Sequence, residues 1–206
     1  MFTNFYTYIF FYILIISSSM GYGLAITSIS KKLKISNNLG YIGLIGVLFL
    51  IIYAYVSSLF ISHGQIHNLI ILLLGVIFFL KFYFLNPKGE DWNYFFLIFF
   101  ILLIGAFIFK THDDFPYYHF SYSHYLTENS IIFGIGQFNL GYRTPSSIFY
   151  LNSLFYLPFV KYFMFHMPAI LIMGFSNLIL LIKLKKNVSN HQINFVTYFT
   201  LLVFIF

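Results

Sequence analysis

Most of the few acidic side chains of this protein lie close together in the sequence. The 206 residues include five Asp and Glu, and three of them, Asp113, Asp114 and Glu128, fall within 16 positions. A carboxylate can take a proton from an acceptor hydroxyl or, with a neighbour, ligate a divalent cation. Two adjacent carboxyls also repel each other, which raises the pKa of one of them. This segment therefore predicts acid–base catalysis or cation binding, with Asp113 and Asp114 as the candidate catalytic pair.

A helix is expected to position these groups. Asp114 stands where an N-cap residue would, with Pro116 in the first turn, which predicts a helix over residues 115–128. Positions i, i+4, i+7 and i+11 place four polar side chains on one face, namely Tyr117, Ser121, His124 and Glu128. A simpler interpretation stays open: Asp114 only caps the helix, and the polar face points to water.

Arg143 is the only arginine of the chain and the second candidate for chemistry. It follows a glycine-rich segment that lacks the Gly-Lys-Ser/Thr ending of a phosphate-binding P-loop. Thr144 and Pro145 have the residue types of an N-cap and a first helical residue, which predicts a second helix over 145–157, lying on the membrane surface. A guanidinium beside a helix N-terminus can bind phosphate. The alternative is that Arg143 pairs with a loop carboxylate or with lipid headgroups.

Other candidate ligands are weaker. His63 and His67 have the i, i+4 spacing that can hold a metal ion, but no Glu stands between them as in zinc peptidases, so chance is the better explanation. The chain has no cysteine, which excludes disulfides, cysteine-based zinc sites and a thiol nucleophile. A divalent cation at the acidic cluster is the only cofactor that the sequence suggests.

The elements that must carry these residues are membrane helices. Hydrophobic side chains make up 60% of the chain and charged ones 8%, whereas an ordinary soluble protein has about 25% charged residues. This composition excludes a cytosolic enzyme, a nucleic-acid-binding module and a secreted disulfide scaffold. Since a span needs about 20 apolar residues, we expect an all-α polytopic bundle with five complete spans and an incomplete sixth, at 5–29, 40–62, 69–85, 92–109, 163–182 and from 194 onward. Close helix packing is expected at Gly21, Gly23, Gly43 and Gly46.

The incomplete last span indicates a truncated chain or the N-terminal part of a longer protein. Residues 1–109 form a four-span bundle, 110–162 an outer loop with interfacial helices, and 163–206 the fifth span, a cytoplasmic lysine-rich junction and the start of the sixth. Eight Lys lie at the junctions of one side, against Lys110, Arg143 and Lys161 on the other. The positive-inside rule therefore predicts that the N-terminus lies outside. The net charge of +6 belongs to the cytoplasmic side and does not indicate a nucleic-acid partner.

Two segments of the outer loop resemble the C-type glycosyltransferases, a superfamily of multi-span membrane enzymes, and in particular its uncharacterised bacterial members. The first reads Asp-Asp-Phe-Pro-Tyr-Tyr-His from Asp113 to His119, and the second reads Gly-Ile-Gly-Gln-Phe-Asn from Gly134, with Arg143 downstream. The resemblance covers about residues 110–160. It implies that Asp113 or Asp114 is the base that deprotonates an acceptor hydroxyl. It also implies that Arg143 helps to hold the phosphate of a polyprenyl-phosphate-linked sugar donor.

The resulting hypothesis is an inverting transferase that moves a sugar on the outer face of a bacterial cytoplasmic membrane, in cell-envelope assembly. The three loop acids and Arg143 should then meet at one cavity, where the remaining candidate substrate ligands are His119, His124, Glu128 and Tyr117. Two alternatives remain open: a polysaccharide polymerase or flippase-like envelope protein, and a membrane protein without enzymatic activity. A transporter is disfavoured because the first, second and fourth spans hold no ionisable acidic or basic residue between their ends.

Overall fold

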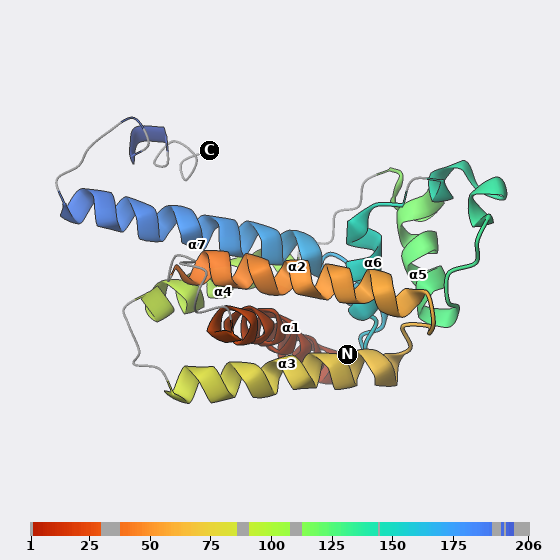
Figure 1. The fold of residues 1–206 in the computed structure, drawn as a ribbon, viewed down its shortest axis with the longest axis horizontal. Helices are drawn as coiled ribbons and strands as arrows, with labels where there is room; N and C mark the ends of the chain where they lie inside the picture. Colours follow the sequence, from red (N-terminus) through yellow and green to blue (C-terminus); the bar gives the residue numbers. More distant parts are fainter. Residues whose placement is uncertain are drawn as a thin grey trace.

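The fold is a helical bundle with a smaller helical cap at one end (Figure 1). The computed structural model describes residues 2–29, 38–85, 91–107, 113–143, 145–190, 195 and 197–199. The α-helices are α1 (Phe2–Ile29), α2 (Leu39–Ser58), α3 (Gln65–Leu85), α4 (Asp91–Ala106), α5 (Phe120–Glu128), α6 (Ser147–Leu154) and α7 (Met167–Ser189). Short helical turns are η1 (Phe115–His119), η2 (Ile135–Gln137), η3 (Leu140–Tyr142) and η4 (Tyr162–Met164). The cap, as we use the word, comprises the described residues of 113–164.

Four helical segments of the described chain are long and apolar enough to cross a membrane: Phe5–Ile29, Leu39–Ser58, Gln65–Leu85 and Tyr162–Ser189. They correspond to four of the predicted spans. Helix α4, predicted as a full span over 92–109, has only 16 residues. At 1.5 Å per residue it is about 24 Å long, shorter than a hydrocarbon core of about 30 Å. Most of the predicted sixth span lies outside the described residues.

Glycines allow the long helices to approach one another at backbone distance. An added Cβ on Gly46 of α2 would overlap the carbonyl oxygen of Ser19 in α1, and one on Gly23 would overlap the carbonyl oxygen of Ile42. The predicted packing role of Gly21, Gly23, Gly43 and Gly46 is confirmed, since a Cβ on any of them would overlap atoms of a neighbouring helix.

Tyrosine hydroxyls join α1 to its other neighbours. Tyr12 donates a hydrogen bond to the carbonyl of Phe99 in α4 (2.7 Å), and Tyr22 donates to the carbonyl of Ile71 in α3 (2.7 Å). These polar contacts are directional, so they set the rotation of α1 in a bundle that is otherwise held by apolar packing.

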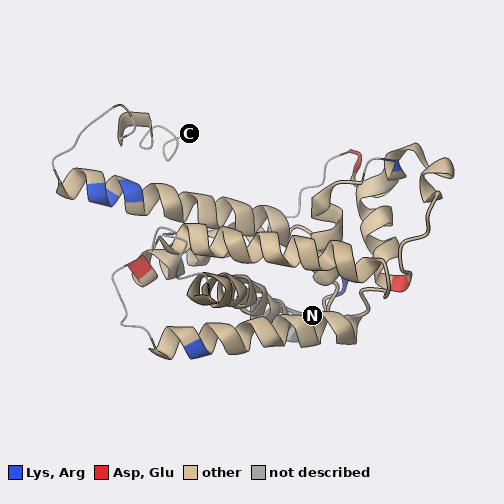
Figure 2. Ribbon diagram, in the orientation of Figure 1, with Lys and Arg blue, Asp and Glu red and all other residues tan. Residues whose placement is uncertain are grey.

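Charged residues gather at the two ends of the bundle (Figure 2). The charged positions of α3, α4 and α7 lie at the end away from the cap, and the other described charged positions belong to the cap. This separation is what a membrane-spanning bundle requires, because a charge in the hydrocarbon layer is costly.

Candidate functional site

The predicted helix over 115–128 is present as two consecutive pieces, η1 and α5. Its first turn is a π-turn, in which the backbone N–H of Phe120 bonds to the carbonyl of Phe115 five residues earlier. Asp114 occupies the N-cap position, but its side chain makes no capping hydrogen bond. Instead, Tyr118 donates from its hydroxyl to Oδ2 of Asp114 at 3.2 Å. The interpretation of Asp114 as a simple cap is therefore wrong, and its carboxylate is engaged by an aromatic hydroxyl.

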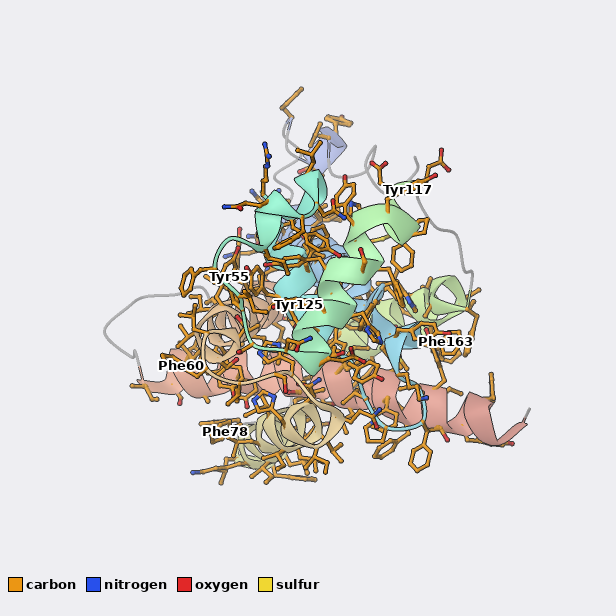
Figure 3. All side chains as sticks on the ribbon, turned by 90° about the vertical axis from the view of Figure 1, so that its right-hand side faces the viewer. Tyr55, Phe60, Phe78, Tyr117, Tyr125 and Phe163 are labelled. Atoms are coloured by element: carbon orange, nitrogen blue, oxygen red, sulfur yellow. The ribbon has the colours of Figure 1, made fainter. Side chains whose placement is uncertain are left out.

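The predicted polar face of this helix is partly exposed: Tyr117 and Glu128 are exposed, and Ser121 and His124 are half-buried. The exposed fractions of Tyr117 and Glu128 are 73% and 66%, and Nδ1 of His124 lies 3.9 Å from Oε1 of Glu128. Figure 3 looks onto the cap and shows Tyr117 near its edge and Tyr125 nearer the middle. The opposite face of α5 is buried and packs on α6, with Tyr122, Ser123, Leu126 and Thr127.

The three acids of the loop do not share one site. Asp114 precedes the first turn and Glu128 ends the helix, so the rise of 1.5 Å per residue separates their backbones by about 20 Å. His124 and Glu128 lie together at the far end, whereas His119 lies near Asp114. The ring of His119 contacts Tyr118 (4.4 Å between centroids) and the buried ring of Phe149 (5.0 Å). The expectation that all three acids meet Arg143 therefore fails for Glu128.

Arg143 reaches the neighbourhood of the acidic pair through a close contact between η1 and η3. A Cβ added to Gly141 would lie 2.5 Å from Cβ of Tyr118, so these two turns pack at backbone distance. Arg143 follows Gly141 by two residues, and Tyr118 binds Asp114. The exposed guanidinium uses Nε–H to donate to the carbonyl of Gly136 at 3.2 Å. Among the described residues, no carboxylate lies within ion-pair distance of Arg143.

The helix after Arg143 differs from the prediction in its start and in its environment. It begins at Ser147, because the Ser146 hydroxyl accepts from the backbone N–H of Ile148 at 3.3 Å and so acts as the N-cap. Pro145 is thus outside the helix, and the predicted cap Thr144 lies outside the described residues. The environment of the helix is the protein interior: the six residues from Phe149 to Leu154 are all buried, against α2, α5 and α7.

A cleft of about 490 Å³ opens beside Arg143 in the cap. Its walls come from α5, α6 and the segment that joins them, and they include Tyr122, Gln137, Tyr142 and Tyr150. The hydroxyls of Tyr122 and Tyr150 lie 2.9 Å apart. Sequence reasoning missed these side chains because they come from separate segments with no shared spacing.

His63, which the sequence offered only as half of a weak metal-ligand pair, makes hydrogen bonds to several helices. His63 is fully buried in the α2–α3 connection. Its Nδ1 lies 2.6 Å from the hydroxyl of Ser153 in α6, and its Nε2 lies 2.8 Å from the hydroxyl of Ser57 in α2. Its backbone N–H donates to the carbonyl of Leu126 in α5 at 2.8 Å. His63 therefore holds the cap on the bundle.

The i, i+4 partner His67 belongs to the same network and does not complete a metal site. Its Nε2 lies 2.8 Å from the hydroxyl of Tyr53, and its Nδ1 lies 3.0 Å from Oδ1 of Asn68. All four ring nitrogens of the two histidines are therefore used within the protein. The part of the chain that the structure describes contains no group of three His, Cys, Asp or Glu able to hold a metal ion.

His63 should make the stability of the protein depend on pH. Burial, and secondarily the nearby His67, lowers the pKa of His63 from 6.5 to about 3. In the unfolded chain His63 thus binds a proton below about pH 6.5, whereas in the folded protein it binds one only below about pH 3. The free energy of unfolding is therefore unaffected by this titration above pH 6.5. Below that pH it falls by on the order of 1 kcal/mol per pH unit as the pH drops toward 3. Thermal unfolding between pH 7 and 4 should show a shallower pH dependence for His63→Gln than for the parent protein. A His124→Gln control should keep the parent slope, and equal slopes for all three proteins would contradict the assignment.

No protein-family model matches the chain, and neither a curated protein nor a solved structure shows significant similarity to it. The class that the fold itself defines is a helical membrane protein with a polar, tyrosine-rich cap.

Proposed function

We propose that the protein is a membrane glycosyltransferase that takes its sugar from a polyprenyl-phosphate-linked donor. In this proposal the cap lies on the outer face of a bacterial cytoplasmic membrane, and the lysine-rich end of the bundle faces the cytoplasm. The observation that carries the proposal is the packing of η1 on η3, which brings the segment of Asp113 and Asp114 against the segment of Arg143. A base and a phosphate-binding cation are the two groups that such a transfer requires.

In the proposed reaction, the acceptor hydroxyl attacks the anomeric carbon of the donor sugar. The new carbon–oxygen bond forms on the face opposite the leaving group, so the configuration inverts. The bond between the anomeric carbon and the phosphate oxygen breaks, and its electron pair leaves with the polyprenyl phosphate. One carboxylate of the pair takes the hydroxyl proton, and the guanidinium stabilises the departing phosphate.

The bonding of Asp114 suggests how the two carboxylates divide their tasks. Asp114 accepts from the Tyr118 hydroxyl and is half-buried, whereas Asp113 is exposed. The pKa of Tyr118 is raised by desolvation and then by the Asp114 carboxylate, so this hydroxyl stays protonated and remains a donor. In the proposal Tyr118 positions Asp114, and Asp113 is the group that meets the acceptor.

Replacing Asp113 and Asp114 together with asparagine should reduce sugar transfer by about 100-fold, the usual order of loss when a general base is removed. The rate is measured in membranes of cells that express the protein, with polyprenyl-phosphate-linked sugars as donors and the loss of labelled donor as readout. Asp91→Asn is the matched control, because it makes the same change at the far end of the bundle. The proposal is wrong if the double variant transfers sugar at the parent rate or if the parent protein consumes none of the donors.

A further inference from the structure

The cleft beside Arg143 has the dimensions and the lining of a small-molecule site. Its volume of about 490 Å³ lies within the range of roughly 300–1,000 Å³ that ligand pockets occupy. Tyr122 and Tyr150 are almost fully buried at 2% and 4% exposure, while Arg143 and Gln137 are exposed. The site thus combines two buried aromatic residues with two solvent-accessible polar side chains.

We propose that this cleft binds a sugar phosphate, with Arg143 and the Tyr122–Tyr150 hydroxyl pair as donors to the phosphate and Tyr142 against the sugar ring. The inference deepens the proposed function and rests on it for one point, namely that the cyclic part of the ligand is a sugar. That the ligand is an anion follows from the residues that line the cleft.

The hydroxyls of Tyr122 and Tyr150 have one O–H donor that their mutual hydrogen bond does not use. Two hydroxyls 2.9 Å apart use one O–H for the bond between them, and the second O–H is left for another acceptor. Among the described residues, neither hydroxyl has a second partner within hydrogen-bond distance. Burial, and then the bond to Tyr150, raises the pKa of Tyr122, which keeps its hydroxyl protonated near neutral pH. Buried donors are almost always satisfied, so a ligand oxygen is the natural acceptor here.

Arg143 adds the charge. Within the described residues only its Nε–H is engaged, on the carbonyl of Gly136, so both terminal nitrogens can donate to a phosphate. None of the described residues that line the cleft is acidic. Asp114, whose segment packs against that of Arg143, accepts from Tyr118. The cleft is therefore a cationic site that favours an anion.

Tyr142 supplies a surface for a ring. Its own ring stands edge-on to Tyr122, with centroids 5.1 Å apart, and it is only partly buried. An aromatic face beside polar donors is the usual composition of a site that orients a small cyclic ligand. A sugar that projects from a phosphate held by Arg143 would contact this face.

Calorimetry with the purified protein in nanodiscs and glucose 1-phosphate as ligand tests the proposal. We expect binding of glucose 1-phosphate, weaker binding of inorganic phosphate and none of glucose. Arg143→Gln should lower the affinity for glucose 1-phosphate at least tenfold. Tyr150→Phe should lower it by about fivefold, which corresponds to the loss of one hydrogen bond. Lys161→Gln removes the other described cation of the cap, which does not line the cleft, and should leave the affinity unchanged. Thermal unfolding of each variant confirms that it is folded.

Equal losses in Arg143→Gln and Lys161→Gln, or no binding of glucose 1-phosphate by the parent protein, would overturn the proposal. The ligand can be a lipid-linked or a soluble sugar phosphate, and farnesyl phosphate in the nanodisc distinguishes the two. If it competes with glucose 1-phosphate, the cleft binds a lipid-linked sugar phosphate. If it does not compete, the cleft binds a soluble one. The two proposals fail separately. Binding without any sugar transfer refutes the transferase alone, whereas transfer that depends on Asp113 and Asp114 without binding refutes the cleft alone.

Discussion

Replacing Gly46 with alanine should lower the stability of the bundle by about 3 kcal/mol, the upper part of the range for overpacking a tight interface. The added methyl group would overlap the carbonyl oxygen of Ser19 and approach the backbone nitrogen of Gly23, so it meets backbone rather than a side chain that could rotate away. Helices α1 and α2 would have to move apart. For a protein of this size the midpoint of thermal unfolding should fall by about 6–12 °C.

Gly105→Ala in α4 is the matched control for this substitution. Apart from its own helix backbone, no atom of the described residues lies within 4 Å of the position that its Cβ would take. Because alanine favours a helix over glycine by up to about 1 kcal/mol, this control should unfold at the parent temperature or slightly above it. Unfolding of both variants in the same detergent measures the difference. A loss of stability that is equal in the two variants would show that α1 and α2 are not packed at backbone distance.

Asn68→Ala should cost a similar amount, about 3 kcal/mol, by a different mechanism. The amide nitrogen of Asn68 lies within hydrogen-bond distance of three carbonyls, those of His63 (2.8 Å), Ser153 (2.8 Å) and Tyr156 (2.9 Å), which share its two N–H donors. Asn68 is fully buried, so water cannot replace it, and each unsatisfied buried group costs about 1–3 kcal/mol. Two of the carbonyls belong to the cap, which should therefore detach before the bundle unfolds.

Limited proteolysis tests the detachment of the cap directly, alongside thermal unfolding. Cleavage within residues 113–164 should become faster in Asn68→Ala at temperatures at which the long helices stay intact. Asn93→Ala, on the exposed side of α4, is the control and should change neither the cleavage rate nor the unfolding temperature. Parent-like resistance of the cap in Asn68→Ala would show that this network does not hold it.

Local physical chemistry accounts for the features that the sequence predicted well. Long apolar runs form helices because their backbone groups must be satisfied where water is absent, and this holds regardless of neighbours. The helix over 115–128 follows from its own residues in the same way. The glycines of α1 and α2 also signalled their role, because only a residue without a side chain permits backbones to touch.

Nearby competing signals explain the local errors. Thr144 with Pro145 and Ser146 offer N-caps two residues apart, and the chain uses Ser146. Asp114 stands at an N-cap position, yet a hydroxyl one turn later takes its carboxylate. In the first case two residues suited one role, and in the second one carboxylate had two possible partners, so the sequence alone left each choice open.

The sequence by itself determined that this chain is an apolar helical bundle, because composition and periodicity are local properties. Only the tertiary structure decided which polar residues meet. His63 and Ser153 are 90 positions apart, and Tyr122 and Tyr150 are 28 apart, yet each pair is hydrogen-bonded. Such pairs have no fixed spacing, since they depend on how α5 and α6 pack against the ends of α2 and α3. The same packing buries α6 and brings η1 against η3.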